Sequence, residues 1–180
     1  SGQSFSDFLL GKLKGFEGLY PTLKDWEDHT TIAFPEVRLK QYLEMRGADA
    51  GPWNRICALP ALWVGLLYDK KSLDDSFNLA KTFMDNNTLN EARISAAKYG
   101  LRGKIKNFEI VEIASNMLDI SYQGLKRRNF LDKKGISETQ FLDPLFNIID
   151  RRKTPAEEMI ASFDKKWAGN IDNIFDSNYF

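Results

Sequence analysis

The segment 36–46 alternates between apolar and charged side chains, and this pattern narrows the choice of fold more than any other part of the chain. A period of two residues is typical of a β-strand with one apolar and one charged face, because successive side chains point to opposite sides. We therefore expect the main strand at 36–46, with a second strand at 30–34. The apolar face comprises Val37, Leu39, Leu43 and Met45, and the charged face comprises Glu36, Arg38, Lys40, Glu44 and Arg46.

Glu44 and Arg46 are the chemically informative pair on the charged face. They are two residues apart, so their side chains emerge on the same side of a strand, roughly 7 Å apart at the backbone. A carboxylate can hold Mg²⁺, and an arginine can clamp a phosphoryl oxygen with its planar fork, as ATP-dependent chemistry requires. An ordinary surface ion pair is the alternative. Gly47 and Gly51 favour the functional interpretation, because they give the loop beside the pair its backbone freedom.

The chain beyond residue 53 predicts a mostly helical layer. In the segment 108–128, apolar side chains recur at helical spacing. The segment Thr154–Glu157 combines an N-cap, a proline at the first helical position and a carboxylate three residues after the cap. We expect an α+β chain, predominantly helical, folded as a single domain over 1–180 with one or two strands and about six helices. The expected helices cover 54–68, a stretch after Ser72, 88–99, 108–128, 143–151 and 155–166, after a brief amphipathic piece at 6–12 and a glycine-broken loop.

Charge and cysteine content exclude several classes of function. Lys+Arg and Asp+Glu number 25 each, so the formal net charge is zero, which argues against charge-driven binding of nucleic acid or membrane surfaces. The single cysteine, Cys57, excludes an internal disulfide and a zinc site built on cysteines. The longest apolar run, 58–67, is too short to span a bilayer. We expect a cytoplasmic protein, or a plastid protein in a plant-like host.

The most specific similarity to known sequences lies in the segments Phe34–Lys40, Tyr42–Asp49, Gly51–Trp53, Cys57–Ala61 and Trp63–Asp69. These segments resemble one known family, the plant-type glutamate–cysteine ligases shared by plants and many proteobacteria. The resemblance covers the whole chain and is loose only at 70–107. Members of that family are longer, and this chain, which begins at Ser1 without an initiator methionine, resembles a fragment comprising their C-terminal part.

The resemblance implies an ATP-dependent ligase that joins the γ-carboxyl of glutamate to the amine of cysteine through a γ-glutamyl phosphate, the first step of glutathione biosynthesis. It implies ATP as co-substrate, Mg²⁺ as cofactor, and glutamate and cysteine as substrates. It also implies a glutamine-synthetase-like fold, of which this chain is the C-terminal portion. The missing N-terminal part would then be its partner, and the fragment alone would be inactive.

The resemblance also assigns roles to individual residues. Glu44 is expected to be a metal ligand, and Arg46 is expected to be catalytic and to contact the transferred phosphoryl group or the substrate carboxylate. Arg38, Trp53 and His29 are expected to bind substrate or ATP.

Each of the weaker assignments has a structural alternative. Arg38 fits a solvated strand residue about as well, Trp53 fits a core tryptophan packed on Pro52, and a lone histidine such as His29 is more often structural. Some plant members use the position of Cys57 in a redox-regulating disulfide, but its partner is absent here, which favours a buried core thiol. Another carboxylate–amine ligase and a non-catalytic helical interaction module remain alternative functions.

Overall fold

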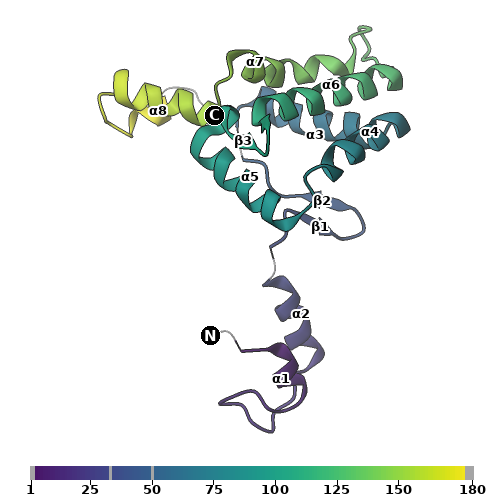
Figure 1. Cartoon of the computed structure of the whole chain (residues 1–180), viewed down its shortest axis with the longest axis vertical. Coiled ribbons are helices and arrows are strands. Elements are labelled where there is room, and N and C mark those ends of the chain that lie inside the picture. The colour runs from purple at the N-terminus through teal and green to yellow at the C-terminus, as the bar shows by residue number, and fades with distance from the viewer. Residues whose placement is uncertain (1–2, 33, 50, 177–180) are drawn as a thin grey trace. The chain divides into compact units, whose positions relative to one another are not determined.

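The computed structural model describes residues 3–32, 34–49 and 51–176, most of which are helical (Figure 1). The chain divides into two compact units, Ser1–Asp49 and Ala50–Phe180. The expectation of a single domain stays a prediction. Within the described ranges, no helix combines the length and the apolar character needed to cross a membrane.

Two helices begin the first unit, α1 (Phe5–Leu9) and α2 (Leu23–Thr31). The sequence predicts only the first of them, as the amphipathic piece at 6–12. The second begins at a capping box, in which the side chains of Thr22 and Asp25 each accept a hydrogen bond from the other's backbone N–H. The missed helix therefore carries a recognisable start signal.

The strand predicted at 30–34 is wrong where the structure describes it, because α2 continues through Thr31 and ends at Ile32; residue 33 lies outside the described residues. The hydroxyls of Thr30 and Thr31 donate to backbone carbonyl oxygens three residues earlier, at 2.7 Å each. A β-branched run favours a strand only weakly, so the local hydrogen bonds of the helix decide the conformation here.

The single strand predicted at 36–46 is also wrong, because this segment folds into a hairpin. Strand β1 (Val37–Leu39) pairs antiparallel with β2 (Leu43–Met45), and the Lys40 N–H donates to the Tyr42 carbonyl oxygen at 2.9 Å in the turn. The turn contains no glycine, proline, asparagine or aspartate to signal it. Directly opposed residues of an antiparallel pair share a face, so the predicted apolar and charged faces remain as expected.

The second unit is a helical layer in which α3, α4, α6 and α7 lie side by side (Figure 1). Among the described residues of this unit, two short 3₁₀ helices and a small antiparallel pair of strands lie in the connections between its helices. Its elements are α3 (Trp53–Leu67), α4 (Lys70–Lys81), α5 (Asn86–Tyr99), η1 (Gly100–Arg102), β3 (Lys104–Ile105), β4 (Phe108–Glu109), α6 (Ile110–Arg128), η2 (Glu138–Leu142), α7 (Asp143–Arg151), α8 (Pro155–Lys165) and α9 (Asn173–Asp176).

Sequence patterns locate five of the six predicted helices of the second unit to within two residues; α4 begins at Lys70, before the predicted start after Ser72. The start of α6 lies two residues after the predicted start because Lys106, at φ 54°, and Asn107 turn the chain between β3 and β4. The described residues hold nine α-helices and two small antiparallel sheets, so the chain is predominantly helical as expected, with more helices than the six predicted. The confirmed helices are those predicted after Ser72 and at 54–68, 88–99, 108–128, 143–151 and 155–166.

The core of the second unit lies where α3 crosses α6. Its buried apolar cluster comprises Ala61, Leu118, Leu125 and Leu142, from α3, α6 and η2. Leu125 and Leu142 are fully buried. The apolar side chains that recur at helical spacing in α6 thus form the face that packs on α3.

Two glycines allow α3 and α6 to approach at backbone distance. A methyl group added at Gly124 would lie against the carbonyl oxygen of Gly65 and 2.7 Å from the Ser72 Oγ. The Ser121 hydroxyl donates to the Leu62 carbonyl oxygen across the same contact, at 2.9 Å. Backbone contact between the two helices therefore requires both positions to lack a side chain.

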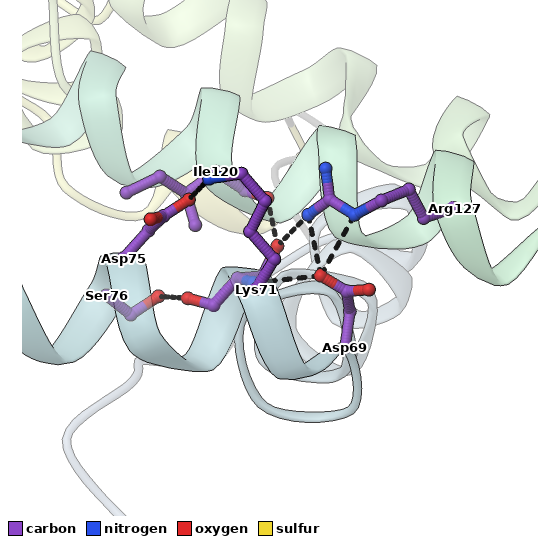
Figure 2. Close-up of polar contacts among 7 residues, drawn as sticks. Asp69, Lys71, Asp75, Ser76, Ile120 and Arg127 are labelled. Atoms are coloured by element: carbon purple, nitrogen blue, oxygen red, sulfur yellow. Dashed lines mark hydrogen bonds and ion pairs between the residues drawn. The ribbon is translucent and has the colours of Figure 1, made fainter.

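An aspartate–arginine clamp ties the start of α4 to the end of α6 (Figure 2). Arg127 donates to the Asp69 Oδ1 from Nε at 3.0 Å and from Nη2 at 2.6 Å. Asp69 also caps α4 by accepting the Ser72 N–H at 2.8 Å, and the Ser72 hydroxyl donates to the Ile120 carbonyl oxygen at 2.9 Å. Arg127 lies in the last turn of α6, where a positive side chain is favoured by the helix dipole, and Asp69 is its specific partner.

The clamp predicts a loss of stability in acid. The hydrogen bond from Arg127, aided by the Ser72 N–H, lowers the pKa of Asp69 from 3.8 to about 2. Because the folded-state pKa lies below the unfolded value, the stabilisation is complete above about 3.8 and disappears as pH falls through about 2. We expect Asp69→Asn, which keeps a cap, to melt at a lower temperature than the parent at neutral pH, with the difference shrinking between these two values.

Melting curves followed by circular dichroism test this. Asp74→Asn is the matched control, because Asp74 lies in the same helix and pairs with Lys70 only at 4.0 Å on an exposed surface. A pH-independent difference for Asp69→Asn would contradict the role of the clamp.

Candidate active site

Arg38 and Glu44 face each other across the β1–β2 hairpin. They are directly opposed in the strand register. The Arg38 Nε donates to the Glu44 Oε2 at 2.7 Å, and its Nη2 lies 2.7 Å from the same oxygen. The hairpin thus places a guanidinium and a carboxylate in direct contact on its charged face.

Arg46 directly follows β2, two residues beyond Glu44, and reaches the same carboxylate. Its Nε lies 3.9 Å from the Glu44 Oε2, and its guanidinium sits over the ring of Phe34, 5.2 Å from the centroid. Its Nη1 is buried and has no hydrogen-bond partner among the described residues. A buried donor without an acceptor destabilises the folded state. This nitrogen is therefore available to an acceptor that the described residues do not supply.

The charged face carries more positive than negative charge around Glu44. Three cations, Arg38, Lys40 and Arg46, lie within 4.0 Å of this one carboxylate. The second oxygen, Oε1, has only Lys40 nearby, at 3.8 Å, and accepts no hydrogen bond from the described residues. This arrangement attracts an anion to the arginines and leaves one carboxylate oxygen open.

The hydrogen bond from Arg38 is the main reason why the pKa of Glu44 is lowered; partial burial opposes it, and the charges of Arg38, Lys40 and Arg46 add to it. We expect Arg38→Gln to raise the pKa of Glu44 toward the ordinary glutamate value, because the strongest donor is lost. Titration of the side-chain carboxyl carbon by NMR measures this. Lys24→Gln, on the exposed surface of α2, serves as the control, and an unchanged Glu44 titration in Arg38→Gln would contradict the assignment.

His29 packs against aromatic side chains of α1 and α2. Its ring stacks on Phe5, with centroids 4.2 Å apart, and also lies 5.9 Å from the ring of Trp26. No hydrogen bond, ion pair or ring contact among the described residues links it to the hairpin. These contacts match the structural alternative, and a substrate-binding role for His29 stays a prediction.

Trp53 and Cys57 belong to the second unit. Trp53 is the first residue of α3 and is 76% exposed, so the core alternative is wrong for this side chain. Its expected role in binding substrate stays a prediction. Cys57 is half-buried rather than fully enclosed.

The described residues hold no group of three or more histidine, cysteine, aspartate or glutamate side chains that could surround a metal ion. On the charged face, Glu44 has one oxygen, Oε1, that accepts no hydrogen bond from the described residues. This fits a single ligand of a shared magnesium site, because protein-bound Mg²⁺ commonly takes only one or two carboxylates and completes its shell with water and phosphate.

Comparison with known proteins shows the family. Residues 11–177 match the family described as glutamate-cysteine ligase family 2 (GCS2), and the chain belongs to this family. The range includes the whole hairpin and nearly all of the second unit.

Plant enzymes are among the curated relatives. The chain is 42% identical over 176 residues to "Glutamate--cysteine ligase, chloroplastic" of Solanum lycopersicum, covering 98% of this chain and 32% of the relative. The enzyme of the same name from Arabidopsis thaliana is 39% identical over 176 residues, again covering 98% and 32%. "Glutamate--cysteine ligase A, chloroplastic" of Oryza sativa subsp. indica is 42% identical over 175 residues, covering 97% and 34%. The chain therefore spans about a third of the length of these relatives.

Sequence reasoning paired Glu44 with Arg46 and missed its closer contact with Arg38. A single strand would hold Arg38 six residues away from Glu44, whereas the hairpin brings them face to face. The alternation of the sequence places Arg38 and Glu44 on the same face. The turn between them contains no residue typical of turns, so the sequence does not indicate that the chain reverses there.

Proposed function

We propose that this chain supplies the phosphoryl-facing hairpin of an ATP-dependent ligase that joins the γ-carboxyl of glutamate to the amine of cysteine, the first step of glutathione biosynthesis. The names of the relatives support this reaction. The Nη1 of Arg46 carries the assignment of the site, because it is a buried donor for which the described residues supply no acceptor.

The reaction needs such a donor at a defined moment. A carboxylate is a poor electrophile, so its oxygen first attacks the terminal phosphorus of ATP, and ADP leaves. The cysteine amine then attacks the acyl carbon, loses a proton, and phosphate leaves. Arg46, with Arg38 beside it, would stabilise the charge on the phosphoryl oxygens during the first step.

Glu44 would supply one ligand to Mg²⁺ through its open Oε1. Bound with the nucleotide, the ion would neutralise phosphate charge. Arg38 and Arg46 hold the other oxygen, Oε2, and so orient the carboxylate. Arg38, Trp53 and His29 are further candidates for contacts with ATP or substrate.

The hairpin would complete its sheet with strands from the rest of the enzyme. Two residues of its apolar face, Leu39 and Leu43, are 79% and 61% exposed, and an isolated two-stranded hairpin is marginally stable in water. We therefore propose that the chain is the C-terminal part of a glutamine-synthetase-like fold and is inactive alone. The names of the relatives include the word chloroplastic, which supports a plastid location for this protein in a plant-like host. In other hosts, we propose a cytoplasmic location.

A reconstitution assay tests the proposal. The chain is mixed with the N-terminal portion of the tomato relative, glutamate, cysteine, Mg²⁺ and ATP, and ADP release is followed. We expect turnover that requires both parts and that disappears with Glu44→Gln. Full activity from the 180-residue chain alone would refute the fragment assignment.

Two further outcomes separate the alternatives. Turnover with another amine in place of cysteine would indicate a different carboxylate–amine ligase. A stable complex without turnover would indicate a helical interaction module that shares only the fold.

A further inference from the structure

A hollow of about 310 Å³ lies in the second unit, between the start of α3, the helix α7 and the start of α8. Its size falls at the lower end of the range for small-molecule sites. Part of its wall is apolar, formed by three prolines and Ile148. The polar remainder of the lining comprises Asn54, Arg55, Asn147, Arg151 and Glu158.

Arg55 is the informative side chain in this lining. It is half-buried, yet it forms no hydrogen bond or ion pair with any residue that the structure describes. Arginine normally meets a carboxylate or phosphate when it is partly removed from water. A guanidinium in this position therefore has its donors available to an anion in the hollow.

The neighbouring groups make the hollow positive overall. Arg151 lies 3.4 Å from Glu158, so these two charges largely offset each other and Arg55 supplies the excess charge. The N-cap of α3, Pro52, provides no side-chain cap, and the partial positive charge of this helix end adds to the attraction.

Gly51 borders the Arg55 side chain. A methyl group at this position would lie 3.0 Å from the Arg55 Nε and 3.4 Å from its Cζ. The absence of a side chain leaves the guanidinium room beside the loop.

From this lining, we propose that the hollow binds a small organic molecule bearing one carboxylate or phosphate group. The anionic group contacts Arg55, assisted by the amide of Asn54 and by the second N–H of the Asn147 amide, whose first N–H donates to the Asp143 carbonyl oxygen at 2.9 Å. The carbon skeleton lies on the prolines and Ile148. One negative charge fits best, because the hollow has an excess of one positive charge. The hollow is built from the second unit alone, so this proposal does not rest on the ligase activity.

NMR titration of the isotope-labelled 180-residue chain tests the proposal. Butyrate and inorganic phosphate are added in separate arms, with sodium chloride matching the ionic strength. We expect saturable shifts of the backbone amides at 53–55 and 147–151 with at least one of the two anions. The more effective anion identifies whether carboxylate or phosphate is preferred.

Variants establish whether Arg55 is responsible. We expect Arg55→Gln to raise the Kd about tenfold or more, the loss of about 1.4 kcal/mol of binding free energy. Arg93→Gln, which removes the same charge from the exposed surface of α5, should change the Kd less than about twofold. If Arg55→Gln does not fold, Asn147→Asp introduces a repelling charge instead and should weaken binding comparably. Absence of saturable shifts with both anions, or equal weakening by Arg55→Gln and Arg93→Gln, would overturn the proposal.

Discussion

Arg46→Gln is expected to lower the kcat of the reconstituted ligase by about 10²–10³-fold, as the loss of one charged donor to a developing transition-state charge typically does. The change removes the planar fork and the positive charge while keeping a side chain of similar length. The buried Nη1 of Arg46 has no partner in the described part of the chain, so we expect the substitution to remove an interaction with substrate or transition state. Steady-state kinetics of ADP release, with ATP and glutamate varied separately, measure the effect.

Arg46→Lys separates charge from geometry. Lysine keeps the positive charge but cannot form two parallel hydrogen bonds, so we expect most of the loss in kcat to persist. Lys24→Gln, on the surface of α2, should leave kcat and KM unchanged. If Arg46→Gln raised only the KM for ATP, the residue would bind the nucleotide equally in ground and transition states, and a catalytic role would be refuted.

Gly124→Ala is expected to destabilise the second unit by about 3 kcal/mol, the upper range for an added group in a tightly packed core. The new methyl group would meet the Gly65 carbonyl oxygen and the Ser72 Oγ. Relief requires α3 and α6 to separate, which strains the hydrogen bond from Ser121 to the Leu62 carbonyl oxygen. Alanine otherwise favours a helix by about 1 kcal/mol over glycine, so a loss would be attributable to the close contact.

Chemical denaturation measures this change through the midpoint and slope of the unfolding transition. Gln123→Ala is the matched control, because it lies on the same helix next to Gly124 and is exposed. We expect the control to change the free energy of unfolding by less than about 0.5 kcal/mol. A neutral or stabilising effect of Gly124→Ala would show that the two helices do not pack at backbone distance.

Local sequence signals predicted the helices of the second unit well. The capping box at Thr154 and Glu157, with proline at the first helical position, marks the start of α8 to the residue. The start of α2 carries an equally clear box, but the following β-branched residues and glycine-rich surroundings led to a strand and a loop instead. A capping box depends on only a few neighbouring residues. It therefore predicts a helix start correctly unless nearby residues favour another conformation.

The sequence predicted which residues belong to the candidate site, but it did not predict the contacts between them. Alternation by itself identified Glu44, Arg46 and Arg38 as members of one charged face, because side-chain direction in a strand depends only on parity. The direct contact of Arg38 with Glu44 depends on where the chain reverses. Lys40–Tyr42 reverses the chain without any turn residue, so the sequence offered no local signal of it.

The sequence by itself determined the family, the helical character and the charged face of the hairpin, since these follow from composition, periodicity and closely similar segments. Tertiary structure alone decided the contacts between distant residues: Arg127 with Asp69, the glycines of α3 against α6, and the hollow around Arg55. These contacts join helices separated by long stretches of chain. Their geometry depends on how side chains fill the space between helices. A local sequence pattern does not contain this information.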